Sequence, residues 1–210
     1  MSTSLTEHLL VHKILTLDGF VSADTAINLY NDMTRNSKFN PSMVSDKRGE
    51  VNAVTDTAYN DTQHYGRISE TAFHFSFSPR ALNALENITK DMAGILGVEV
   101  DQFEPWQCTR YFTGGLFDYH DDCGNWASNE RLYTVMLTVK APDFGGATHF
   151  PRLNKMIESK SSRVLIWRNL NEDFLCDGMS QHSGMPVGEL GTEDEKMILV
   201  TWVRRFKYVS

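Results

Sequence analysis

The residues best suited to chemistry lie in one stretch, Tyr111–Asp122, which ends in His120-Asp121-Asp122. On a β-strand alternate side chains leave the same face, so His120 and Asp122 would reach one point while Asp121 points away. Two histidines and one carboxylate that leave coordination positions open are a ligand set suited to Fe(II). The pattern therefore predicts a metal site that needs a second histidine from a distant part of the chain.

A second histidine and a lysine lie downstream in a suitable order. His182 is the best candidate for the remaining ligand, within Gln-His-Ser-Gly-Met-Pro-Val. Lys196 begins an apolar segment that ends in Trp202-Val-Arg204, and no other Lys or Arg lies between His182 and Lys196. A lysine there can hold the far carboxylate of a dicarboxylic co-substrate as a point charge.

Five elements follow one another through the second half of the chain. They are Tyr111-x-x-Gly114-x-x-Phe117-x-x-His120-x-Asp122, Gly145-Gly146-x-Thr148-x-Phe150, His182-x3-Pro186-Val187, Lys196 and Trp202-x-Arg204. This ordered series resembles the iron(II)- and 2-oxoglutarate-dependent dioxygenases of the prolyl 4-hydroxylase type. The resemblance covers about Trp106 to Phe206, whereas the first half matches only loosely. Two departures are a longer interval between His182 and Lys196 and Leu-Thr-Val where relatives end a strand in Tyr-Leu-Asn.

The resemblance implies the composition of the site. The metal ligands would be His120, Asp122 and His182, with no further catalytic residue. Lys196 would bind the 5-carboxylate of 2-oxoglutarate, and the neighbouring hydroxyl groups would come from Tyr111, Thr148 and Thr138. The implied reaction consumes O2, converts 2-oxoglutarate to succinate and CO2, and hydroxylates a substrate C–H bond. L-Ascorbate would be a candidate reductant.

The substrate is expected to be a peptide or a small molecule, with peptidyl proline first. Candidate substrate residues are Tyr65 and Arg67 in the segment 38–70, and Trp202 and Arg204, for which a structural role is the alternative. The same oxygenase chemistry on a free amino acid or small molecule remains open. So do a catalytically silent metal-binding β-barrel and a zinc or manganese hydrolase, in which the open position holds an activated water. Oligomeric state is not readable from the sequence.

The elements that must position these residues change character along the chain. Leu9 to Val21 has the composition of a strand, Ser22 is an N-cap for a helix over 23–35, and Ser78-Pro79 opens a second helix closed by Gly97. The segment 38–70 is expected to be mostly loop, with a short strand near Val51. Seven short runs follow: Gln107–Phe112, Phe117–Asp122, Leu132–Val139, Ala147–Phe150, Arg163–Arg168, Gln181–Met185 and Met197–Phe206.

These runs predict an antiparallel β core behind N-terminal helices. The fold class expected is α+β, with helices packed on a double-stranded β-helix (jelly-roll) as the resemblance implies. The chain would form a single dioxygenase domain over 1–210. Residues 1–105 would supply helical support and substrate loops, and 106–206 the jelly-roll core with the iron site.

Composition excludes several classes of protein. The 210 residues carry a net charge of −7 without a run of Lys or Arg, so a nucleic acid is not an expected partner. No window reaches the ~20 apolar residues of a membrane span, and the first twenty residues are not a signal peptide. The three cysteines Cys108, Cys123 and Cys176 form no CxxC pair, and this odd count argues against disulfides. We therefore expect a soluble, cytoplasmic protein.

Overall fold

The computed structural model describes residues 5–45, 51–53, 66–123 and 129–209. Its α-helices are α1 (Leu5–His12), α2 (Ala23–Asn36) and α3 (Pro79–Leu96). Both predicted N-caps are present, because the Ser22 hydroxyl accepts from the Thr25 amide at 3.0 Å and the Ser78 hydroxyl accepts from the Ala81 amide at 3.1 Å. Gly97 ends α3 in the left-handed conformation, at φ +63°.

The predicted strand over 9–21 is wrong in its first part. Residues up to His12 belong to α1, and only Ile14–Leu17 forms a strand, β1. Lys13 makes the change of direction at φ +66°, with its amide donating to the Leu9 carbonyl. A short apolar run is compatible with helix or strand, so composition alone could not separate the two.

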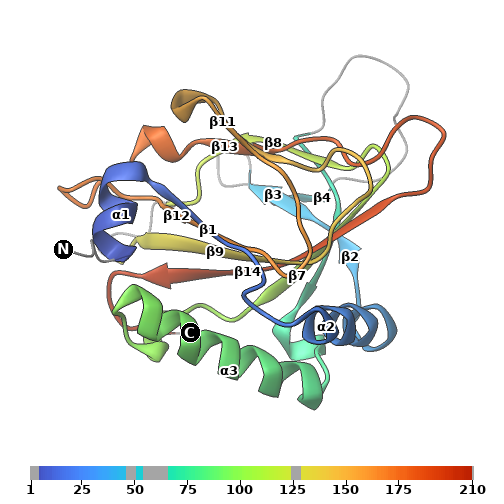
Figure 1. Cartoon of the computed structure of the whole chain (residues 1–210), viewed down its shortest axis with the longest axis horizontal. Coiled ribbons are helices and arrows are strands. Elements are labelled where there is room, and N and C mark those ends of the chain that lie inside the picture. The colour runs from blue at the N-terminus through green and yellow to red at the C-terminus, as the bar shows by residue number, and fades with distance from the viewer. Residues whose placement is uncertain (1–4, 46–50, 54–65, 124–128, 210) are drawn as a thin grey trace.

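Two antiparallel sheets form the centre of the molecule (Figure 1). The seven-stranded sheet has the order β1-β12-β9-β14-β7-β6-β2, and the five-stranded sheet has the order β11-β10-β13-β8-β5. The strands of the first are β1, β2 (Asn40–Pro41), β6 (Glu70–Phe73), β7 (Gln107–Phe112), β9 (Arg131–Lys140), β12 (Val164–Arg168) and β14 (Glu195–Arg204). Those of the second are β5 (Arg67–Ile68), β8 (Leu116–His120), β10 (Thr148–Phe150), β11 (Lys155–Ile157) and β13 (His182–Gly184).

Smaller elements complete the described structure. A separate pair consists of β3 (Met43–Ser45) and β4 (Val51–Ala53), which confirms the strand expected near Val51. Short 3-10 helices are η1 (His74–Ser76), η2 (Val100–Gln102), η3 (Pro151–Leu153) and η4 (Gly178–Ser180). Together with the helices, the two facing sheets confirm the α+β class and the jelly-roll core.

The core has two layers because strand side chains alternate. On β9, Tyr133, Val135 and Leu137 pack with residues of the helices, whereas Met136 packs between the sheets. Figure 1 shows α2 and α3 lying along the outer face of the seven-stranded sheet. The helices thus cover one face of this sheet, and its other face is free to form a site with the five-stranded sheet.

The first half of the chain contributes more than helices and loops. It supplies β1, β2 and β6 to the larger sheet and β5 to the smaller one, so the expected boundary at residue 105 does not separate the sheets from their support. Within the segment expected to be mostly loop, 38–70, the short strands β2, β3, β4 and β5 and the first residue of β6 pair with other strands. Its residues 46–50 and 54–65 lie outside the described part of the chain.

The argument against disulfides is wrong. Cys123 and Cys176, 53 residues apart in sequence, are joined by a disulfide, and Cys108 is a buried free thiol. An odd number of cysteines says nothing about which two the fold brings together. The cysteines therefore no longer support the expectation of a cytoplasmic protein. Within the described residues, the helices are too short or too polar to cross a membrane.

Candidate metal and co-substrate site

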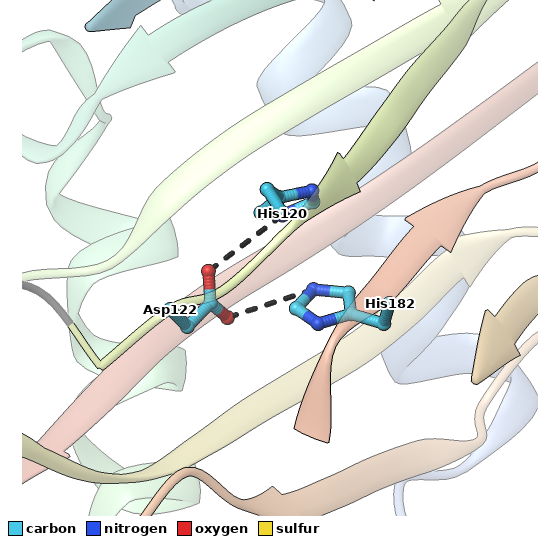
Figure 2. A group of neighbouring side chains, drawn as sticks. All are labelled: His120, Asp122 and His182. Atoms are coloured by element: carbon cyan, nitrogen blue, oxygen red, sulfur yellow. Dashed lines mark ion pairs between the residues drawn. The ribbon is translucent and has the colours of Figure 1, made fainter. Parts of the chain in front are cut away.

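The structure brings the three predicted metal ligands together. One potential ligand atom from each of His120, Asp122 and His182 lies within 4.8 Å of the others. The two histidines face each other across the ladder, at the end of β8 and the start of β13 (Figure 2). Asp122 lies two residues beyond the end of β8. The carboxylate of Asp122 therefore reaches the site from a bend after the strand. The sequence had suggested instead that Asp122 lies on the strand itself, on the same face as His120.

A β-bulge in β8 sets the direction of the His120 ring. His182 pairs with His120 and Gly184 with Phe117, so three steps on β8 oppose two on β13. The extra residue places Phe117 and His120 on the same side, with their rings stacked at 3.6 Å between centroids. Phe117 thus packs directly against a candidate ligand.

Both imidazoles present the same nitrogen to the carboxylate. The Nδ1 of His120 lies 2.7 Å from the Asp118 carbonyl, and the Nδ1 of His182 lies 2.9 Å from the Ser180 carbonyl. A carbonyl only accepts, so each Nδ1 carries a proton, and in a neutral imidazole the free lone pair then lies on Nε2. The Nε2 atoms lie 3.7 and 3.8 Å from the two carboxylate oxygens of Asp122. The donor set and its orientation fit a divalent transition metal at their centre.

The protonation states also favour metal binding. Burial, with a smaller contribution from His182, lowers the pKa of His120 to about 4. Burial by itself would raise the pKa of Asp122, but the two histidines oppose it and lower that pKa to about 2. At neutral pH His120 is therefore neutral and Asp122 ionised, which are the forms that coordinate a metal.

A pocket of about 80 Å³ opens beside the triad. Its lining residues come from both sheets: Arg67, Gln107, Thr109, Tyr111, Phe117, His120, Asp122, Met136, Thr148, Trp167, His182, Gly184, Lys196, Ile198, Val200 and Trp202. The walls are mainly apolar, with two cationic side chains. Such a pocket can hold a small polar molecule in a fixed orientation.

Lys196 is a buried cation in this pocket. Its ammonium donates to the Gly146 carbonyl at 2.6 Å, and no carboxylate pairs with it in the described part of the chain. Burial lowers the pKa of Lys196 from 10.5 to about 8. Gly146 has φ +66°, and a Cβ there would lie 3.2 Å from Lys196 Cδ and 2.9 Å from Pro142 Cγ. The glycine therefore allows the lysine to enter the pocket, where it can receive an anion.

The other predicted site residues divide into two groups. Tyr111 and Thr148 line the pocket, and Tyr111 lies opposite Lys196 in the ladder between β7 and β14. Thr138 is buried but is not part of the pocket wall. Its contact with the co-substrate stays a prediction.

The candidate substrate residues also differ in position. Arg67 and Trp202 line the pocket. Arg204 lies outside the pocket wall and pairs with Glu104, with 2.6 Å between its Nε and a carboxylate oxygen. Tyr65 lies outside the described residues.

Sequence reasoning missed the residues that hold Asp122. The Thr134 hydroxyl donates to its Oδ2 at 2.7 Å, and the Asn169 amide donates to Thr134 at 2.9 Å. Thr134 lies on β9 and Asn169 directly after β12, far from Asp122 in sequence. Side-chain alternation along β9 is the one sequence signal that would have placed Thr134 on the inner face of the sheet. No sequence signal related Asn169 to the site.

Comparison with known proteins supports the same class. A protein of Acanthamoeba polyphaga mimivirus named "Putative prolyl 4-hydroxylase" is 28% identical over 142 residues, 62% of this chain and 55% of that protein. Prolyl 4-hydroxylase subunit alpha-1 of Gallus gallus is 24% identical over 135 residues, 60% of this chain and 25% of the subunit. The chain thus spans about half of the first relative and a quarter of the second. No protein-family model matches the chain.

Solved structures share the fold over nearly the whole chain. The viral collagen prolyl hydroxylase of Paramecium Bursaria Chlorella virus-1, solved as a 2OG complex, has a TM-score of 0.63 at 22% identity, covering 92% of this chain and 97% of its own. A Pseudomonas putida prolyl-4-hydroxylase has a TM-score of 0.64 at 15% identity, covering 96% and 97%.

The chain shares its fold with these solved hydroxylases, and His120, Asp122 and His182 form a candidate set of metal ligands. The named relatives confirm the resemblance of this chain to the prolyl 4-hydroxylase type.

Proposed function

We propose that this chain is an Fe(II)- and 2-oxoglutarate-dependent dioxygenase that hydroxylates peptidyl proline. The observation that carries the proposal is the combination, in one pocket, of the His-Asp-His set with the buried ammonium of Lys196, which pairs with no carboxylate of the described residues. A hydrolase built on the same triad has no use for that cation. A silent metal-binding barrel has no use for it either. The choice of proline follows the names of the relatives.

Each residue has a role that its position supports. His120, Asp122 and His182 would hold Fe(II) through two Nε2 atoms and a carboxylate oxygen. Lys196 would pair with the 5-carboxylate of 2-oxoglutarate, with Tyr111 and Thr148 as hydroxyl neighbours. The bound metal supplies oxidative decarboxylation of the co-substrate and hydroxylation of a C–H bond by O2.

The remaining pocket residues would orient the substrate and exclude water. Arg67 holds its guanidinium 4.4 Å from the centroid of the Phe117 ring, and Trp202 lies under the guanidinium of Arg131 at 3.7 Å. These cation–π pairs help to hold the Phe117 and Trp202 rings at the pocket wall, beside which an apolar ring of a substrate can pack. Free amino acids and other small molecules are the alternative substrates.

The proposal is tested first without oxygen. Fe(II) and 2-oxoglutarate added to metal-free protein should give the visible charge-transfer band of the chelated complex. Proline-containing peptides are then screened for O2-dependent release of succinate, with alanine in place of proline as the matched control. Tight zinc binding without a band would instead indicate a hydrolase, and no metal binding would indicate a silent barrel.

Binding of 2-oxoglutarate is expected to weaken at alkaline pH. The pKa of Lys196 is lowered to about 8, so the ammonium is charged below that pH and loses its proton above it. A bound carboxylate requires the charged form, so binding above pH 8 takes up a proton. The apparent Kd should therefore rise about tenfold between pH 7 and 9. Titrations of the Co(II)-loaded protein would measure it, and a Lys196→Met variant should show no such dependence. An unchanged Kd in the wild-type protein would contradict the assignment.

A further inference from the structure

Asp122 is held by a buried relay of two hydrogen bonds. The Asn169 Nδ2 donates to the Thr134 hydroxyl at 2.9 Å, and that hydroxyl donates to Asp122 Oδ2 at 2.7 Å. Asn169 and Thr134 are both 0% exposed. A hydroxyl has a single hydrogen, and because Asn169 donates to it, that hydrogen is directed to the carboxylate. Asn169 therefore makes Thr134 the donor in its hydrogen bond to Asp122.

A disulfide also links the backbone beside Asp122 to the backbone near Asn169. Cys123, the residue after Asp122, is bonded to Cys176, and the amide of Asp177 donates to the Asn169 carbonyl at 2.8 Å. The disulfide and this backbone hydrogen bond thus connect the backbone of Asp122 to that of Asn169, whose side chain is the first donor of the relay. Both the main chain and the side chain of Asp122 are attached to the same point, Asn169.

Asp122 needs such support more than the two histidines do. His120 and His182 lie on paired strands, where the ladder fixes the backbone and a carbonyl fixes each ring. Asp122 lies in a bend outside the ladder. Its carboxylate has two oxygens and a broad side-chain torsion, so without a partner it could turn away from the metal.

We propose that Thr134 and Asn169 are positioning residues for the metal, and that the disulfide between Cys123 and Cys176 anchors the same ligand through its backbone. The inference rests on the proposed function, since it concerns the affinity of the site for the divalent metal. The orientation of the Asp122 carboxylate would then depend on the Thr134 hydroxyl, the Asn169 amide and the disulfide, none of which is a proposed metal ligand.

Co(II) titration of the metal-free protein tests the relay. Thr134→Val removes the hydroxyl with little change of shape, and it should weaken Co(II) binding about 10–100-fold and alter the visible ligand-field absorption of the bound ion. Thr134→Ser keeps the hydroxyl and should restore most of both. Thr201→Val is the matched control, because Thr201 is an equally buried threonine whose hydroxyl donates to the Glu104 carbonyl at 2.6 Å and not to Asp122.

Failure of the relay and failure of the proposed function would give different results in the Co(II) titration. If Thr134→Val binds Co(II) as tightly as the wild-type protein, or if Thr201→Val weakens binding equally, the relay has no positioning role. If the wild-type protein binds no Co(II), the proposed function itself fails, and the inference fails with it.

The disulfide is tested separately, in a Cys123→Ala, Cys176→Ala double variant whose folding is confirmed by circular dichroism. Loss of the covalent anchor should lower Co(II) affinity about tenfold or more. Because Cys176 is exposed, a small dithiol can reach the bond and reduce it to two thiols while forming its own disulfide. Reduced and repurified wild-type protein should then behave like the double variant. Unchanged affinity in both would overturn the role of the disulfide.

Discussion

Replacing His182 with alanine is expected to abolish the Fe(II)–2-oxoglutarate charge-transfer band and all 2-oxoglutarate-dependent succinate release. His182 is 4% exposed and supplies one of only two imidazoles in the triad. Residues that merely orient a metal ligand are worth about 10–100-fold in affinity, so loss of a ligand should cost more than about 100-fold. Anaerobic titration with Fe(II), followed in the visible region, measures the effect.

His149→Ala is the matched control for this substitution. His149 pairs with Ser183 in the adjacent strand, and its Nδ1 contacts the Tyr119 hydroxyl at 2.7 Å and not the triad. The control should keep the band and the affinity for Fe(II). A His182→Ala protein with a normal band would show that the metal lies elsewhere.

Replacing Lys196 with methionine is expected to have two large effects of opposite sign. The co-substrate loses its charge partner, and removing one member of a buried ion pair costs about 3–5 kcal/mol. That corresponds to an increase of about 100-fold or more in the Kd of 2-oxoglutarate. Isothermal titration of the Co(II)-loaded protein measures this loss. An unchanged Kd would remove Lys196 from the site.

The same substitution should stabilise the protein in the absence of ligands. Burial of the ammonium lowers its pKa from 10.5 to about 8, which corresponds to a cost of about 3 kcal/mol for the charged form. Methionine avoids this cost. The Gly146 carbonyl keeps a donor, because the Ser159 hydroxyl also reaches it at 2.6 Å. The free energy of unfolding at pH 7, measured with urea, should therefore rise by up to about 3 kcal/mol.

The pH dependence of stability gives a second readout. Between pH 8 and 10.5 the unfolded wild-type chain binds more protons at this lysine than the folded protein does, so wild-type stability rises with pH. The advantage of the Lys196→Met variant should shrink over the same range. Lys90→Met serves as control, because Lys90 forms an exposed pair with Glu86 and its loss should change stability little. A destabilised Lys196→Met protein at pH 7 would contradict the argument.

Local signals in the sequence were sufficient for α2, α3 and most strands, but not for α1. Ser22, Ser78 and Gly97 cap helices where they were expected to, since capping depends on a few neighbouring backbone groups. Short strands such as β11 escaped notice, because three residues carry too little periodicity to be recognised. The change from helix to strand at Lys13 was missed for the same reason.

The sequence by itself determined the residue types of the candidate site and their order, because a metal needs particular ligands at a suitable spacing. Only the tertiary structure decided which cysteines meet and that Arg204 pairs with Glu104 outside the pocket. It also decided that Lys196 is buried with no carboxylate partner in the part of the chain that the structure describes. It also showed that Asp122 depends on Thr134 and Asn169. Such contacts join residues far apart in the chain, and they arise from the facing of two sheets, which no local pattern encodes.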